Sequence, residues 1–176
     1  MSRYRTLLFS GGAAAALVLA STLPAAAATT PTTFTIGAGA LTISAPASAN
    51  LGTVASGVGT LSGSLGGNVV VTDNRGLILG GWTASATSTD FSDGASPAHT
   101  IPATNVLYTP GAVTVSGVVV AVPLIGTLSN TTALNVVTAT GVLGSDSASW
   151  DPTLTVTIPA AAPAGTYSAT LTHSVA

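Results

Sequence analysis

The sequence of 176 residues contains no cysteine, no glutamate and only three Lys or Arg residues. The lack of cysteine excludes disulfides, thiol chemistry and cysteine metal sites, so stability has to come from the burial of apolar side chains. Two of the cations, Arg3 and Arg5, lie at the N-terminus, which leaves Arg75 as the only one in the rest of the chain. One Arg against five Asp gives that part a net charge of −4 with neutral histidines.

This scarcity of positive charge excludes several kinds of partner. A domain with one cation does not neutralise a phosphate backbone, so we expect no nucleic-acid binding, and an anionic membrane surface is equally unsuitable. The most apolar run after the N-terminal region, Val118–Ile125, is far shorter than the ~20 residues that cross a bilayer, and Pro123 interrupts it. We therefore expect a buried strand there and no membrane span once the leader is removed.

The N-terminus has the pattern of a secretory signal peptide. The charged start MSRYR is followed by the apolar run TLLFSGGAAAALVLASTL and an A-x-A site that ends at Ala28. This pattern predicts a signal peptide at 1–28, cleavage after Ala28, and a secreted domain at 29–176. The alternative is an uncleaved N-terminal anchor, which the short, Gly/Ala-rich apolar core disfavours.

Apolar and polar residues alternate with period two along the remaining chain, as in WTASAT and TLTVTI. This period gives a strand one apolar and one polar face. Gly, Pro and Asp clusters predict turns between the runs, at 73–76, 80–81, 92–94, 110–111, 144–146 and 163–165. Many short Thr/Val-rich strands predict an all-β fold, an immunoglobulin-like β-sandwich.

Tyr167 begins the last alternating run directly after the Pro163-Ala-Gly165 corner. Immunoglobulin-like sandwiches carry a tyrosine corner at such a place, where the hydroxyl bonds back to upstream backbone. A simple hairpin with a buried tyrosine is the alternative.

No motif of an enzyme or of a metal centre is found. The only histidines are His99 and His173, and neither a G-x-S-x-G elbow nor an H-E-x-x-H motif occurs. The stretch Asp90-Phe-Ser-Asp93-Gly94 has too few ligands for a calcium loop, so ordinary turn chemistry is favoured. We expect no catalytic activity, no cofactor and no metal.

Arg75 and the two tryptophans are the candidate site residues, and each has a structural alternative. Arg75 either pairs with Asp73 or Asp90 in a turn or contacts a ligand. Trp82 and Trp150 lie on apolar faces, where a tryptophan usually belongs to the core. The functional alternative is a platform on which a sugar ring stacks.

The segment VTDNRGLILGGWTASATSTDF resembles the first half of a WxL domain, a cell-surface module of Gram-positive bacteria. The shared features are the V-T-D-x-R-G turn, the W-T pair and the S-x-D-F ending. The final stretch, LTVTIPAAAPAGTYSATLTHSV, is similar to the family's closing pattern, a Pro/Gly corner followed by T-Y, L-T and a second Trp-x-Leu. The matched residues are Asp73, Arg75, Gly76, Trp82, Asp90, Phe91, Tyr167, Leu171 and Thr172.

Both Trp-x-Leu motifs differ here from the family pattern. The first is Trp82-Thr-Ala84, and the second is His173-Ser-Val175. WxL domains associate non-covalently with peptidoglycan, and the resemblance carries this role to Trp82 and His173. Trp150 lies outside both motifs and is expected to fill the volume that the second Trp fills elsewhere.

The resemblance thus implies an extracellular protein that binds peptidoglycan or another cell-wall glycan without a covalent bond, and that has other surface proteins as further partners. A structural or adhesive surface protein that binds other proteins or itself, with no glycan ligand, is the alternative. Exposed strand edges and low charge would suit it.

Overall fold

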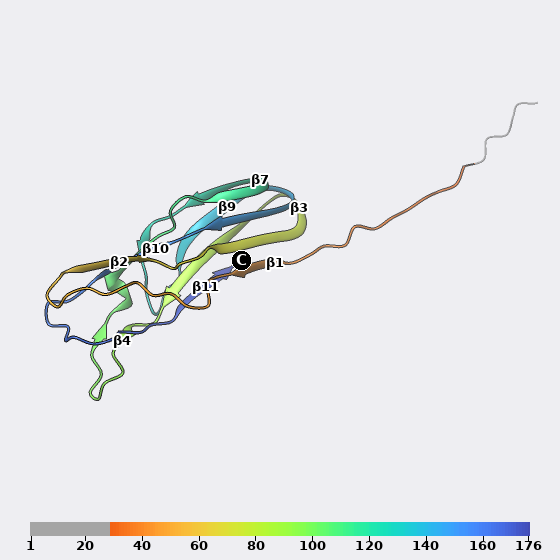
Figure 1. Cartoon of the computed structure of the whole chain (residues 1–176). Helices are drawn as coiled ribbons and strands as arrows, with labels where there is room; N and C mark the ends of the chain where they lie inside the picture. The colour runs from red at the N-terminus through yellow and green to blue at the C-terminus, as the bar shows by residue number, and fades with distance from the viewer. Residues whose placement is uncertain (1–28) are drawn as a thin grey trace, which may run out of the picture. The chain divides into compact units, whose positions relative to one another are not determined.

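The computed structural model describes residues 29–176, of which Ile36–Ala176 form one compact folded unit. The predicted signal peptide at 1–28 lies outside the described residues. Between 29 and 176, no helix is long and apolar enough to cross a membrane. The unit is built from β-strands that pair antiparallel, so the all-β prediction is confirmed (Figure 1).

The elements follow one another with a single short 3₁₀ helix among the strands. They are β1 Leu41–Ser44, β2 Thr60–Ser64, β3 Val69–Ser88, β4 Phe91–Ser92, β5 Thr100–Ile101, η1 Ala103–Asn105, β6 Val106–Thr109, β7 Thr114–Pro123, β8 Gly126–Thr127, β9 Leu134–Trp150, β10 Thr153–Thr157 and β11 Leu171–Val175.

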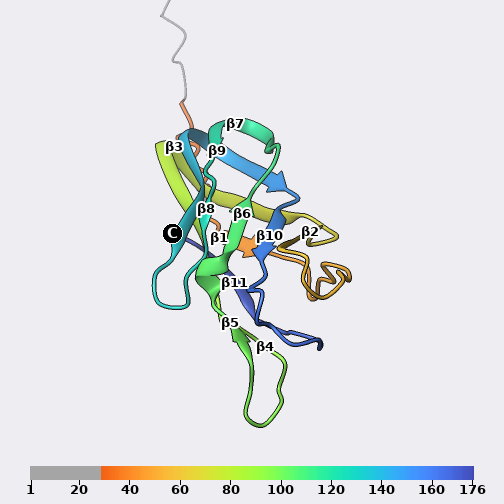
Figure 2. The same ribbon diagram turned by 90° about the vertical axis from the view of Figure 1, so that its left-hand side faces the viewer.

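Three sheets organise these strands. The largest has the order β1-β3-β9-β7, and β11 also pairs with β3, along the part that β1 leaves free. The second has the order β2-β10-β6-β8, and β4 pairs with β5 in a small third sheet (Figure 1, Figure 2). The two long strands β3 and β9 form the centre of the largest sheet, with β7 at one edge.

Three of the six predicted turns lie inside strands, which corrects the sequence analysis. The segments 73–76 and 80–81 belong to β3, and 144–146 belongs to β9. The chain does not reverse at these points; the β3–β9 ladder changes register instead, four times in all. Positive φ angles at Gly76 (69°) and Gly144 (78°) accommodate the irregular backbone, so the glycines mark bulges. The signals at 110–111 and 163–165 fall between strands, and that at 92–94 begins at the last residue of β4 and continues into the loop before β5.

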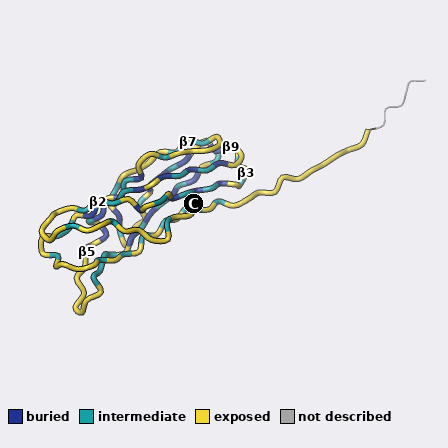
Figure 3. The backbone as a smooth tube through the Cα atoms, viewed as in Figure 1, coloured by how far each residue is buried: buried dark blue, intermediate teal, exposed yellow. Residues whose placement is uncertain are grey.

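Side chains of the two larger sheets meet in one hydrophobic core. Val71 and Trp82 come from β3, Trp150 from β9, Tyr108 from β6 and Val156 from β10. The alternation that the sequence shows is the reason, because every second residue of these strands faces inward. Buried positions accordingly lie along the strands, whereas the loops and most of β7 are exposed (Figure 3).

Candidate functional site

Arg75 is held to Asp73 by a two-pronged ion pair. Its Nε donates to Oδ1 at 2.9 Å and its Nη2 to Oδ2 at 2.8 Å. Nη2 also donates to the carbonyl oxygen of Gly81 at 2.9 Å. Asp73 is one of the two partners that the sequence analysis considered, and the hydrogen bonds from Arg75 lower the pKa of its carboxyl. The guanidinium thus ties the irregular middle of β3 to the point where Trp82 follows.

A second buried carboxyl, Asp146, lies directly opposite Asp73 in the β3–β9 ladder. The indole Nε1 of Trp82 donates to its Oδ1 at 3.4 Å, while Oδ2 has no hydrogen-bond partner among the described residues. Burial raises the pKa of Asp146; the charge of Asp73 adds to this shift, and the Trp82 hydrogen bond opposes it. Arg75 therefore pairs with only one of two inward-facing carboxyls, and Asp146 has the less complete set of partners.

The carboxylates of Asp90 and Asp93 accept hydrogen bonds from backbone N–H groups of nearby loops. Asp90, the other partner considered for Arg75, accepts hydrogen bonds from the N–H of Ala103 at 2.9 Å and from Nδ2 of Asn130 at 3.2 Å. Asp93 lies 2.7 Å from Nδ1 of His99 and accepts from the His99 N–H, contacts that lower the pKa of Asp93 to about 2. Both carboxylates thus take part in ordinary turn hydrogen bonds.

Tyr167 has the geometry of a tyrosine corner. Its hydroxyl donates to the carbonyl oxygen of Pro163, four residues upstream, at 3.1 Å. Its neighbour Ser168 exchanges two backbone hydrogen bonds with Ser92. The corner fixes the path of the chain between β10 and β11 and attaches it to β4.

The two tryptophans lie where the core alternative places them. The exposed fraction of Trp82 is 3% and that of Trp150 is 1%. Neither indole has a face open to a sugar, so stacking on either ring would require the core to open. Of the three residues considered for ligand binding, only His173 borders open space.

A hydrogen-bonded chain links Trp150 to His173. The Trp150 Nε1 donates to the Tyr108 hydroxyl at 3.0 Å, and that hydroxyl lies 3.0 Å from Nε2 of His173. Because the Tyr108 oxygen already accepts from Trp150, we assign its proton to the bond with His173. Burial lowers the pKa of His173 to about 4, so the ring is neutral at pH 7 and carries its own proton on Nδ1. The core thereby fixes both the orientation and the tautomer of the ring.

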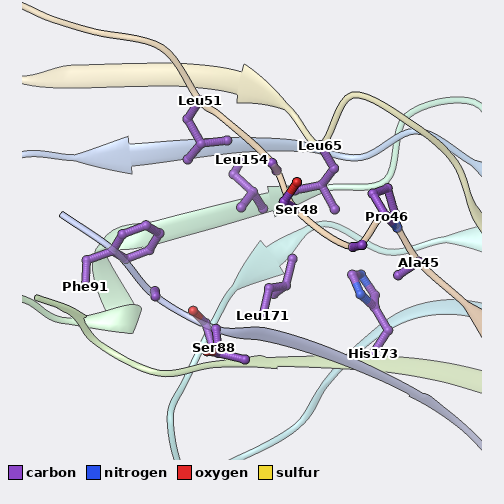
Figure 4. Close-up of a pocket in the computed structure, with 14 residues that line it drawn as sticks. Ala45, Pro46, Ser48, Leu51, Leu65, Ser88, Phe91, Leu154, Leu171 and His173 are labelled. Atoms are coloured by element: carbon purple, nitrogen blue, oxygen red, sulfur yellow. The ribbon is translucent and has the colours of Figure 1, made fainter. Parts of the chain in front are cut away.

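His173 lines a groove of about 240 Å³ between the segment after β1 and the strands β10 and β11 (Figure 4). The ring points toward Ala45 and Pro46, and apolar side chains such as Leu154 and Leu171 form much of the wall. Ser48 and Ser88 add hydroxyl groups.

A wider groove of about 810 Å³ adjoins the first, with which it shares Ala49, Leu51, Phe91 and Ala169. The loop 49–57 and the segment 162–169 form its two sides. None of the described Asp or Arg residues lines either groove; the polar groups are hydroxyls, the Asn50 amide, the neutral His173 ring and backbone. Such a lining suits a neutral ligand with many hydroxyl groups better than an ion.

The described residues contain no group of three or more His, Asp or Glu side chains that could hold a metal ion. The polar groups of the Arg75–Asp73 pair and of the chain from Trp150 to His173 bond to one another. The pair therefore positions the backbone of β3, and the chain positions the His173 ring. What the arrangement offers chemically is reversible binding in the grooves.

Two residues of this network are missing from the sequence analysis. Tyr108 shares parity with the buried Val106, and Asp146 shares parity with Ala148 and Trp150. The alternation of residues along these strands is therefore sufficient to predict that both side chains face inward. Comparison with protein-family models, with curated proteins and with solved structures gives no match to this chain, so the WxL resemblance rests on the quoted motifs.

Proposed function

We propose that this chain is an exported protein with an immunoglobulin-like β-sandwich, related to WxL domains, and that it associates non-covalently with the Gram-positive cell wall. The signal-peptide pattern supports export. The two sheets that share one core, together with the tyrosine corner, support the sandwich.

The observation that carries the proposal is the pair of adjoining, uncharged grooves. A glycan strand of peptidoglycan presents hydroxyl and amide groups, for which the lining hydroxyls, the Asn50 amide and exposed backbone are suitable partners. His173 supplies an oriented N–H, and Phe91 and Tyr167 supply ring surface. The tryptophans contribute by holding the core beneath the grooves.

Co-sedimentation of the exported protein with purified peptidoglycan tests this function. We expect the parent protein to pellet with the wall and to be released by soluble peptidoglycan fragments. Ala49→Trp fills the space that both grooves share and should weaken binding about tenfold or more, a loss of roughly 1.4 kcal/mol. Ala95→Trp, at an exposed loop position that lines neither groove, is the matched control.

Equal pelleting of the two variants would place the wall contact elsewhere, and no pelleting of the parent would refute wall association.

A surface protein that binds other proteins or itself is the second candidate, and the free edge of β7 favours it. Dependence on glycan separates the two functions. The wall binder responds to peptidoglycan fragments, whereas the self-associating protein changes size with its own concentration in the absence of any glycan.

A further inference from the structure

The strand β7 is an edge of the largest sheet and is mostly exposed, which corrects the buried strand that the sequence predicts over Val118–Ile125. It pairs with β9 on one side, and within the described residues no strand pairs with its other side. Val118, Val120 and Val122 are 57%, 64% and 50% exposed, whereas Val119 and Ala121 pack against the core. Natural edge strands are protected by a Lys, an inward charge, a proline, a bulge or a covering loop. Strand β7 has register irregularities at 116–118 and 118–120 and ends at Pro123, but it carries no charged residue.

The apolar surface continues from β7 across its neighbours. Val118 pairs with Leu143 of β9, which pairs with Ile78 of β3, so the three side chains lie side by side on one face. All three are exposed, Ile78 by 83%. An apolar row that starts at a free edge and spans three strands is typical of a surface that a further strand extends.

The segment 29–38 contains the sequence pattern of a strand. Its residues are exposed, and none of them is assigned to a strand (Figure 3). The run Thr33-Phe34-Thr35-Ile36 alternates with period two, and Phe34 and Ile36 are 86% and 85% exposed. Charged residues are absent here as well.

We propose that residues 32–37 of one copy of this chain add as a strand to the free edge of β7 of a second copy. Beyond the bulge at Gly117, β7 continues over Val118–Pro123, with one further register irregularity between Val118 and Val120 and a proline as its last residue. The donor segment is long enough to cover this run. Phe34 and Ile36 would share one face and lie beside the exposed valines, as aromatic and β-branched cross-strand pairs do. The backbone of the donated strand would form hydrogen bonds with the unpaired N–H and C=O groups of β7.

This pairing is heterologous, because the donor and the acceptor are different parts of the chain. The donor segment leads into β1, which pairs with β3 at the edge of the sheet opposite β7. Each copy therefore keeps one free donor and one free edge after pairing, and assembly proceeds head to tail into open chains. The inference rests on the second candidate function, to which it gives a specific partner, and it needs no glycan.

Sedimentation velocity of the full chain, produced with its leader in an exporting host, tests the proposal. We expect the parent to form species that lengthen with concentration. Phe34→Thr with Ile36→Thr removes the donor, and Val120→Lys places a charge at the acceptor edge. Each variant alone should sediment as a monomer, and thermal melts should show a folded domain in both, because all three side chains are largely exposed.

Mixing the two variants gives the decisive result. The Val120→Lys chain retains its donor and the double variant retains its edge, so an equimolar mixture should form one-to-one dimers and nothing longer. A labelled peptide TPTTFTIG should likewise bind the double variant, whereas TPTTTTTG should not. This peptide arm keeps the test decisive if Val120→Lys fails to fold.

Three outcomes overturn the proposal: a parent that is monomeric at every concentration, a double variant that still assembles, and a mixture that stays monomeric. Assembly that survives the loss of Phe34 and Ile36 would indicate direct pairing of two β7 edges. Wall pelleting of the monomeric double variant reports separately on the first candidate function, so failure of self-assembly and failure of wall binding are distinguishable.

Discussion

At the scale of single residues, the contacts of Arg75 explain why a nearly cation-free chain retains one guanidinium. The side chain neutralises Asp73, whose carboxyl is fully buried, and its second hydrogen bond reaches the backbone at Gly81. A lysine has no planar fork to reproduce these contacts. Asp146, opposite Asp73, has no ion pair, and one of its oxygens is buried without a hydrogen-bond partner among the described residues.

Removal of the guanidinium should therefore destabilise the fold. Arg75→Ala strands the Asp73 carboxylate and should lower the free energy of unfolding by roughly 2–4 kcal/mol, near the lower end for a buried pair because Arg75 is partly exposed to solvent. Arg75→Lys should recover only a small part of this loss. Urea melts measure both, with Asp151→Asn at an exposed position as the control that stays within about 0.5 kcal/mol of the parent. If both Arg75 variants melt like the parent but bind wall less, the residue belongs to a ligand site.

At the scale of elements, the neighbouring strands β7 and β9 depend on glycines at their irregular positions. Gly144 and Gly117 both have positive φ, 78° and 91°, but their surroundings differ. A Cβ at Gly144 would meet open space, whereas a Cβ at Gly117 would lie 2.8 Å from the carbonyl oxygen of Ser145 on the neighbouring strand. Backbone strain acts at both positions, and steric overlap with β9 acts only at Gly117.

Substitution by alanine should separate these two effects. Gly144→Ala should cost about 1–2 kcal/mol, the strain of a left-handed conformation. Gly117→Ala should cost more, about 3 kcal/mol, because β7 must also move away from β9. Gly59→Ala, at an open position without a positive φ, should be close to neutral. Thermal or urea melts of the three variants give the order, and equal losses at 117 and 144 would show that the close approach to Ser145 relaxes without cost.

The elements also show which parts of the fold the sequence predicts. Alternation correctly indicates strands around Trp82, Leu154 and His173, because a period of two reports directly which face is buried. The turn signals are wrong at 73–76 and 144–146. Clusters of Gly and Asp occur in bulges as well as in turns, and only the pairing with the neighbouring strand distinguishes the two.

The candidate site is harder to predict for the same reason. Tyr108 and His173 meet across 65 positions of sequence, and Asp146 meets Asp73 through strand register, neither of which is a local property. The grooves depend on how the loop 49–57 and the segment 162–169 approach each other, which composition does not specify. The hydrogen bond of the Tyr167 hydroxyl is predictable from the sequence, because its acceptor lies only four residues upstream.

At the scale of the whole molecule, a fold with so few charges concentrates its response to pH in a few buried groups. His173 is held neutral in the fold, with a pKa of about 4 against about 6.5 in the unfolded chain. The unfolded state therefore binds more protons between these values, and stability falls as pH decreases through this window. Asp146 acts in the opposite direction, since its raised pKa favours the protonated form in the fold and its contribution is lost as pH rises.

The acid limb of the stability curve should accordingly depend on His173. We expect the parent to lose about 2 kcal/mol between pH 7 and pH 4, and His173→Gln, whose amide oxygen still accepts from Tyr108, to lose markedly less. Below about pH 3.8, protonation of Asp73 should destabilise both proteins further, because its folded pKa is lowered by Arg75. Urea melts at intervals of half a pH unit supply the curves. Parallel curves for the parent and His173→Gln would show that the imidazole titrates normally in the fold, and would then contradict the neutral, Tyr108-bonded ring on which the groove's N–H donor depends.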